Sequence, residues 1–196
     1  MVRPQHELGD LPLRFNWQTP ILLSEHNKDI LYYGSNRFHR SLLRGEKLQT
    51  LSQDLTNGAR QGDVPFGTIS TISESPLRFG LVYTGSDDGN IAVSKDGGNS
   101  WTQIGKPGES RKNKSTAKGR LVNLETLPQG LYVSRVLASA YKESRVYVTL
   151  NGYRNDHFNA YVFRSDDYGA SWHQLGMDLP LEPLNVIRED PRSEKI

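Results

Sequence analysis

The sequence predicts an all-β protein built from a repeated unit of four short strands. The first observation is an octapeptide of the form Ser-x-Asp-x-Gly-x-x-Trp, which occurs as SKDGGNSW over residues 94–101 and as SDDYGASW over residues 165–172. The second is that short runs rich in β-branched and aromatic residues flank each copy, bounded by Gly, Asn, Asp or Pro, as is typical of strands. Self-similarity of this kind is the signature of a repeat architecture.

A degenerate third copy, SLLRGEKL, begins at Ser41 and has Leu43 in the aspartate position. Gly45 and Leu48 stand in the positions of the glycine and the tryptophan. The three copies divide the chain into units of similar length. We expect the following parts of one incomplete domain: a first unit over 1–57 with the degenerate octapeptide, a second over 58–104, a basic insertion rich in Gly, Lys and Ser over 105–130, a third over 131–176, and the start of a fourth over 177–196.

Each unit contains four runs with strand character. The expected strands are 13–24, 29–35, 37–41 and 48–52 in the first unit, 67–73, 80–86, 90–94 and 100–104 in the second, and 132–139, 145–151, 160–165 and 171–175 in the third. A further run, PLNVIRED over 183–190, resembles the beginning of another unit. A polar turn follows each first strand and carries an acid at a similar place, which aligns Glu25, Glu74 and Glu189.

The octapeptide has the composition of a tight hairpin between the third and fourth strands. Its aspartate can accept hydrogen bonds from the backbone that follows, and its serine can close the loop with a hydroxyl bond. The glycine shared by both copies supplies a positive φ, and the tryptophan re-enters the strand as a large apolar side chain. We therefore expect structural roles for Ser94, Asp96, Gly98, Trp101, Ser165, Asp167, Gly169 and Trp172.

This pattern is that of the Asp box, or BNR repeat, and the chain resembles the Asp-box β-propellers. That group includes sialidases, xyloglucan-degrading glycoside hydrolases, sortilin-type receptor domains and a photosystem assembly factor. Beyond the octapeptides, the stretches FNWQTPILLS, TISESP, NGYRND and PLNVIRED are similar to bacterial sortilin-like, glycosyl-hydrolase-like repeat proteins. The predicted fold is therefore a partial β-propeller of about three and a half four-stranded antiparallel blades.

A propeller ring closes with roughly four to eight blades, so this chain is expected to be incomplete by itself. We expect the remaining blades to come from a longer chain, with self-association to complete the ring as the alternative. The N-terminus lacks the charged and apolar pattern of a secretory signal. The family resemblance nevertheless implies an exported protein, periplasmic or extracellular.

In a meander of four strands, the connection between the second and third strands lies on the face opposite the octapeptide turns. That face is where propeller enzymes usually hold their substrate, and loops on a rigid scaffold commonly carry binding residues. We expect a glycan or a peptide to bind there. The candidate binding residues come from SNRFHR and NGYRNDHFNA and are Arg37, Tyr153, Arg154, Asn155, Asp156 and His157.

A recognition scaffold is the favoured function, and a glycoside hydrolase fragment of the xyloglucanase or sialidase kind is the alternative. Glycoside hydrolysis needs two carboxyl groups about 5–10 Å apart across a cleft. Asp87 or Asp88, in GSDDGN, together with Asp156 are the weak catalytic candidates. Fold resemblance alone does not decide between the two classes of function.

Bulk composition excludes several other classes of function. The chain has 196 residues, no cysteine and a formal net charge of +2, so disulfides and thiolate metal sites are excluded and nucleic acid is not an expected partner. No stretch approaches the roughly 18 apolar residues of a membrane span, so we expect no membrane insertion. The five histidines show no ligand spacing, and we expect neither a metal site nor a cofactor.

Overall fold

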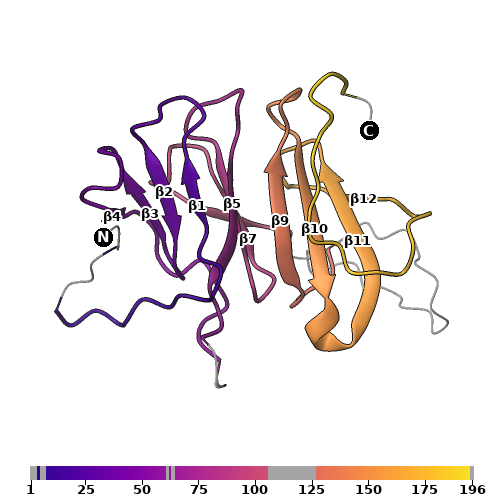
Figure 1. Cartoon of the computed structure of the whole chain (residues 1–196), viewed down its shortest axis with the longest axis horizontal. Helices are drawn as coiled ribbons and strands as arrows, with labels where there is room; N and C mark the ends of the chain where they lie inside the picture. The colour runs from indigo at the N-terminus through magenta and orange to yellow at the C-terminus, as the bar shows by residue number, and fades with distance from the viewer. Residues whose placement is uncertain (1–3, 5–7, 61, 63–64, 106–126, 195–196) are drawn as a thin grey trace.

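The part of the chain that the structure describes forms twelve strands arranged in three sheets (Figure 1). The computed structural model describes residues 4, 8–60, 62, 65–105 and 127–194. Within these residues the only helical element is the short 3-10 helix η1 (Tyr153–Asn155), and none is long and apolar enough to cross a membrane. The predicted insertion over 105–130 lies almost wholly outside the described residues.

Each sheet is an antiparallel meander whose strand order follows the chain. Sheet one contains β1 (Ile21–Leu23), β2 (Leu31–Gly34), β3 (Phe38–Ser41) and β4 (Gln49–Thr50). Sheet two contains β5 (Ile69–Glu74), β6 (Val82–Ser86), β7 (Ile91–Ser94) and β8 (Thr102–Ile104). Sheet three contains β9 (Tyr132–Ala138), β10 (Val146–Gly152), β11 (His157–Ser165) and β12 (His173–Leu175). The predicted all-β class with four antiparallel strands per unit is confirmed.

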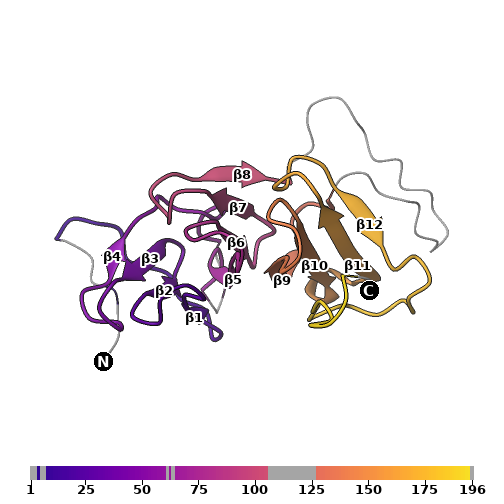
Figure 2. The ribbon, with the colours of Figure 1, turned by 90° about the horizontal axis from the view of Figure 1, so that it is seen from above.

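The three sheets fan out around one side of the molecule, as the view from above shows (Figure 2). Their first strands lie on the inner side and β4, β8 and β12 lie outermost. One apolar cluster fills the space between sheets one and two and includes Tyr32, Phe38, Ile69 and Val82. A second cluster lies between sheets two and three and includes Tyr83, Ile91, Val133, Val148 and Phe163.

Sheet two is buried on both faces because it lies between sheets one and three. Successive side chains of a strand point in opposite directions and therefore enter different clusters. In β6, Val82 belongs to the cluster shared with sheet one, whereas Tyr83 belongs to the cluster shared with sheet three. Sheet one has such a cover on one face only. Ile21 and Leu23 of β1 are accordingly 59% and 46% exposed.

The first strand of one sheet is tied to the preceding sheet by a serine hydroxyl. Ser70 Oγ in β5 donates to the carbonyl oxygen of Val133 in β9 at 2.7 Å. Ser134 Oγ in β9 donates in the same way to the carbonyl oxygen of Leu184 at 2.6 Å. Residues 184–190 belong to no strand and pair with none among the described residues. They therefore lie against sheet three as β9 lies against sheet two.

Glutamate side chains make a second recurring tie between units. Glu189 accepts hydrogen bonds from Ser139 Oγ at 2.6 Å and from the Ala140 amide at 2.7 Å. Glu74 accepts one from the Glu25 amide at 3.0 Å. Glu74 and Glu189 are thus equivalent, but their alignment with Glu25 was wrong, because Glu25 is the donor to Glu74 from the preceding unit.

The two octapeptide turns have the same hydrogen-bond pattern. Asp96 Oδ1 accepts from Ser94 Oγ at 2.8 Å and from the Ser100 amide at 2.9 Å, while Asp96 Oδ2 accepts from Ser100 Oγ at 2.6 Å. The bonds from Ser100 and Ser94 lower the pKa of Asp96 to about 2. Asp167 accepts the equivalent bonds from Ser165 and Ser171 at 2.6–2.8 Å.

The degenerate first turn keeps the serine's contact without the aspartate. Gly45 donates its amide hydrogen to Ser41 Oγ at 3.1 Å, as Gly98 does to Ser94 Oγ at 2.8 Å. The serine hydroxyl therefore suffices to hold the glycine at this corner. The leucine in the aspartate position, Leu43, is 54% exposed.

Candidate functional site

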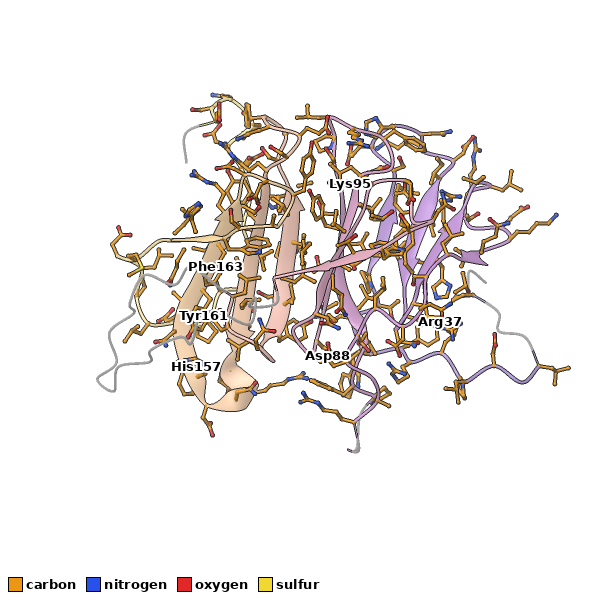
Figure 3. All side chains as sticks on the ribbon, turned by 180° about the vertical axis from the view of Figure 1, so that it is seen from behind. Arg37, Asp88, Lys95, His157, Tyr161 and Phe163 are labelled. Carbon is orange, nitrogen blue, oxygen red and sulfur yellow. The ribbon has the colours of Figure 1, made fainter. Side chains whose placement is uncertain are left out.

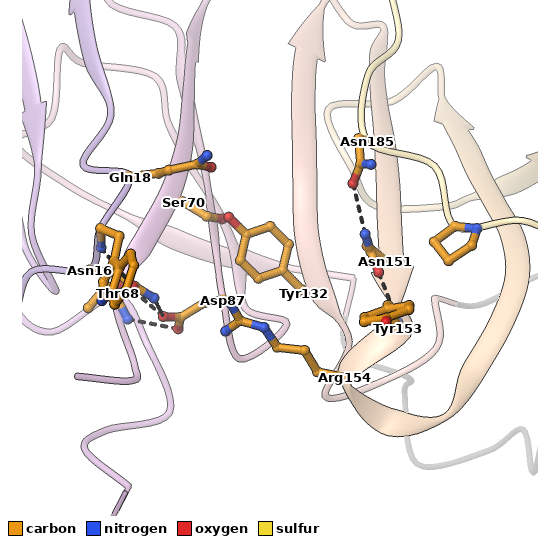
Figure 4. A pocket seen from close by; sticks show the side chains of 12 residues that line it. Asn16, Gln18, Thr68, Ser70, Asp87, Tyr132, Asn151, Tyr153, Arg154 and Asn185 are labelled. Atoms are coloured by element: carbon orange, nitrogen blue, oxygen red, sulfur yellow. Dashed lines mark hydrogen bonds between the residues drawn. The ribbon is translucent and has the colours of Figure 1, made fainter. Parts of the chain in front are cut away.

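A pocket of about 720 Å³ opens where the first strands begin, on the face opposite the octapeptide turns (Figure 4). Its walls come from sheets two and three with their loops, from the segment before β1 and from the segment that follows sheet three. The lining residues are Asn16, Trp17, Gln18, Thr68, Ser70, Asp87, Tyr132, Asn151, Tyr153, Arg154, Pro183 and Asn185. Its volume is within the usual range for a site that holds one small ligand.

Asp87 is held in the floor of this pocket by four hydrogen bonds. Its Oδ1 accepts from the amides of Gly67 and Thr68, both at 2.9 Å. Its Oδ2 accepts from Thr68 Oγ1 at 2.7 Å and from Asn16 Nδ2 at 3.2 Å. A carboxylate offers about four lone-pair positions, so these bonds occupy all of them. The side chain joins the loop between β6 and β7 to the entry of β5.

Three aromatic rings line the pocket at different depths. The side chains of Trp17 and Tyr153 are 87% and 65% exposed, and Tyr132 between them is partly buried. Burial raises the pKa of Tyr132, and the negative charge of Asp87 adds to the shift. Tyr153 is steadied by an edge contact with Phe158, whose ring centroid lies 5.8 Å away. Large exposed rings beside polar groups are typical of a binding surface.

Arg154 extends from η1 across the pocket, with its guanidinium between Tyr132 and Asp87 (Figure 4). Its Cζ atom lies 6.0 Å from the centroid of the Tyr132 ring. Among the described residues, no hydrogen-bond or ion-pair partner is found for this guanidinium. None of its five N–H donors is used by another described residue, so a ligand in the pocket can accept from them.

Side-chain amides hold the rim of the pocket in place. Asn151 Nδ2 donates to Asn185 Oδ1 at 2.8 Å, and Asn151 Oδ1 accepts from the Tyr153 amide at 2.8 Å. On the other side, Asn16 Oδ1 accepts from the Trp17 amide at 2.7 Å. These bonds fix the backbone that carries the two exposed rings.

Of the predicted binding and catalytic residues, the structure brings Asp87, Tyr153 and Arg154 together in the pocket. Figure 3 shows Arg37, Asp88 and His157 along the same edge of the molecule but spread over three sheets, with Lys95 of the first octapeptide at the opposite edge. Arg37, Asp88 and His157 therefore lie on the predicted face, but none of them lines the pocket.

The remaining predicted residues have local partners or lie outside the pocket lining. Asp88 is buried and accepts from Ser86 Oγ at 2.5 Å and from the Asn57 amide at 2.6 Å. His157 Nε2 lies 2.9 Å from the Tyr161 hydroxyl. Asn155 and Asp156 are exposed at the end of η1. The proposed catalytic pairing of Asp87 or Asp88 with Asp156 is thus not assembled in this pocket.

Sequence reasoning missed most of the pocket, including Trp17, Tyr132 and Asn185. It drew its candidates only from the connections between second and third strands, whereas Trp17 precedes β1, Tyr132 begins β9 and Asn185 lies in the segment after sheet three. Segments that lead into first strands emerge on the same face of a meander as those connections. A signal was present in FNWQTP, where a tryptophan stands among polar residues before a proline. Within the described residues no group of His, Asp and Glu could hold a metal ion.

The fold can be compared with solved structures. The chain aligns with an ancestral GH74 enzyme at a TM-score of 0.55 and 13% identity, covering 81% of this chain and 18% of that one. It aligns with a GH74 enzyme of Niastella koreensis at a TM-score of 0.50 and 18% identity, covering 79% of this chain and 20% of that one. These neighbours are β-propellers. Sheets one, two and three are therefore blades one, two and three of a propeller.

The chain spans about a fifth of the length of these GH74 enzymes. A structure of YCF48 bound to the D1 peptide aligns over 83% of this chain and 42% of that one, with a TM-score of 0.45 and 14% identity. No protein-family model matches the chain, and no curated protein matches it. At these identities the likeness shows the fold alone.

Proposed function

We propose that this chain is part of a larger Asp-box β-propeller of the sortilin-like, glycosyl-hydrolase-like kind, and that its pocket recognises a glycan or a peptide. The observation that carries the proposal is the pocket itself, in which two exposed rings and a guanidinium with no hydrogen-bond or ion-pair partner in the described part of the chain surround a volume of about 720 Å³. A rigid scaffold of three packed blades supports it. The shared bond pattern around Asp96 and Asp167 supports the Asp-box assignment.

The carboxylate of Asp87, which lines the pocket, favours recognition without catalysis because its acceptor positions are filled by hydrogen bonds from the protein. A catalytic acid or nucleophile must reach the reacting atoms, and glycoside hydrolysis needs a second carboxyl group nearby. Asp87 has all its lone pairs engaged, and Asp87 is the only acidic residue among the lining residues. The hydrolase alternative would need a further carboxylate from another part of a larger protein.

The test is a binding screen of the protein against immobilised oligosaccharides and peptides, paired with an assay for new reducing ends. We expect binding without turnover. Release of reducing ends by this chain would instead favour the hydrolase. Trp17→Ala should weaken binding about tenfold because the exposed ring is lost. Leu11→Ala is the matched control, since Leu11 is 80% exposed and does not line the pocket.

We also propose that residues 184–190 are the innermost strand of a fourth blade, completed by another part of a longer chain. Support comes from the ties at Leu184 and Glu189, which repeat those made by Val133 and Glu74. Self-association of two copies is the alternative. Analytical ultracentrifugation of this chain at several concentrations separates the two, because only self-association gives a mass that rises with concentration.

A further inference from the structure

We infer that the pocket selects glycans that carry a carboxylate group, such as uronic acids, and that Arg154 is the residue that reads this group. The inference rests on the proposed function, since it names the ligand class of the same pocket. It follows from the unequal states of the two charged side chains that line the pocket, Asp87 and Arg154.

The hydrogen-bonding capacity of the acid in the pocket is already satisfied by the protein. Asp87 accepts two backbone amides, one hydroxyl and one side-chain amide, from Gly67, Thr68 and Asn16. Hydrogen bonds from neutral donors to a carboxylate stabilise its charge in place. Since no lone pair remains, Asp87 offers no acceptor to a cation or a hydroxyl group of the ligand.

The guanidinium of Arg154 has no such partners among the described residues. No hydrogen bond or ion pair to Arg154 is found among the described residues, and its guanidinium lies over the Tyr132 ring at 6.0 Å. The contact with the ring orients the guanidinium without using its N–H groups. A planar guanidinium presents a fork that matches the two oxygens of a carboxylate. The pocket is therefore complementary to an anion with two coplanar oxygens.

The remaining lining residues favour a sugar as the carrier of that anion. Trp17 and Tyr153 present exposed rings, against which the apolar face of a pyranose ring can pack. Gln18, beside Trp17, lines the pocket with a side-chain amide that can donate to and accept from hydroxyl groups. Gln18 and Arg154 approach from opposite sides of the pocket (Figure 4), so one ligand can contact both.

The experiment compares two probes with the same sugar chain, tri-galacturonic acid with its free carboxylates and its fully methyl-esterified, uncharged form, by isothermal titration calorimetry. We expect the acid to bind about tenfold more tightly than the ester, and this preference to weaken as salt is raised. Arg154→Gln should abolish the preference, so that the acid and the ester bind with similar affinity. Arg154→Lys should keep only part of it, because an ammonium group lacks the fork.

Two controls keep the result specific to the pocket. Arg37→Gln removes a cation from a loop on the same face but outside the pocket lining, and it should leave both affinities unchanged. The melting temperature of Arg154→Gln should match that of the parent protein, because the side chain is exposed and makes no bond to lose.

The possible failures are distinguishable. Equal affinity for the acid and the ester would overturn this inference and leave the proposed glycan recognition standing. Binding of an acidic peptide with a free C-terminus, but of neither sugar, would overturn the assignment to glycans. If no sugar or peptide bound, the proposed function would fail along with it.

Discussion

Trp101 packs edge to face on Phe38, with ring centroids 5.0 Å apart and planes inclined at 61°. The two residues belong to different blades, because Trp101 leads into β8 and Phe38 begins β3. The octapeptide corner of blade two is therefore part of its interface with blade one. The same corner brings Gly98 so close that an added Cβ would lie 2.6 Å from Phe38 Cε1.

Gly98→Ala should destabilise the protein more than Gly130→Ala. Both glycines have a positive φ, 100° and 74°, so alanine carries a backbone penalty of about 1 kcal/mol at either position. Only Gly98 also faces Phe38, whereas nothing lies within 4 Å of the position of an added Cβ at Gly130. The clash adds about 1–3 kcal/mol. Urea unfolding of both variants measures the difference, and equal losses would remove the interblade contact from the explanation.

The two octapeptide tryptophans should differ in their contribution to stability. Trp172 is 4% exposed within the cluster between blades two and three, and Trp172→Ala should cost about 3–5 kcal/mol. Trp101 is only partly buried and donates from Nε1 to the carbonyl oxygen of Gly98 at 2.9 Å. Trp101→Ala should therefore cost less. The midpoints of chemical denaturation rank the two variants, and the reverse order would contradict this account of their burial.

Glu189→Ala should loosen the segment that follows blade three. The Ser139 hydroxyl and the Ala140 amide would lose their acceptor, and bonds of this charge-assisted kind contribute about 1.5–3 kcal/mol when shielded from water. Hydrogen exchange at the Ala140 amide is the readout and should accelerate. Glu182→Ala is the control, because Glu182 is exposed and has no side-chain bond among those found in the described residues. Unchanged protection at Ala140 would show that the tie is not maintained in solution.

His39 should make stability fall as the pH is lowered through the weakly acidic range. The ring is fully buried between Ser35 Oγ and Thr50 Oγ1, at 2.8 and 3.0 Å. Burial, aided by the charge of Arg37, lowers its pKa to about 4. The unfolded chain binds a proton near the ordinary pKa of about 6.5, so folding is progressively disfavoured between pH 6.5 and pH 4.

The full effect of this histidine corresponds to about 3 kcal/mol. His39→Gln keeps hydrogen-bonding groups but does not titrate, so its stability should vary less with pH over that window. Comparing the two denaturation series isolates the histidine from the carboxylates, which titrate in both proteins. Parallel curves for the parent and the variant would show that the buried ring does not control this pH dependence.

The octapeptides could be interpreted from the sequence because their chemistry is local. Asp96 binds Ser100, four residues ahead, and Gly98 binds Ser94, four residues behind. Residue types and spacing are enough to predict such a turn, and two copies are enough to predict equivalent blades. The error over Glu25 arose because its partner, Glu74, is 49 residues away in the next blade.

The pocket could not be predicted in this way, because it is formed by contacts between residues that are far apart in the sequence. Asn16 reaches Asp87 across 71 residues of chain, and Arg154 lies over Tyr132 on a neighbouring strand of the same blade. Asp87 illustrates the difference, because in the sequence it is an acid in a glycine-rich loop and a weak catalytic candidate. Its four donors, which occupy every lone pair, come from residues that no local pattern connects with it.

By itself, the sequence determined the strand content, the meander and the face on which loops gather, since each depends on neighbouring residues and on a period of two along a strand. Only the tertiary structure decided which loop residues share a pocket, which acid has its acceptor positions filled by donors and which cation has no hydrogen-bond or ion-pair partner among the described residues. Those outcomes depend on how far the blades rotate relative to one another, and that rotation is set by side-chain packing between sheets, which is a property of residues distant in sequence.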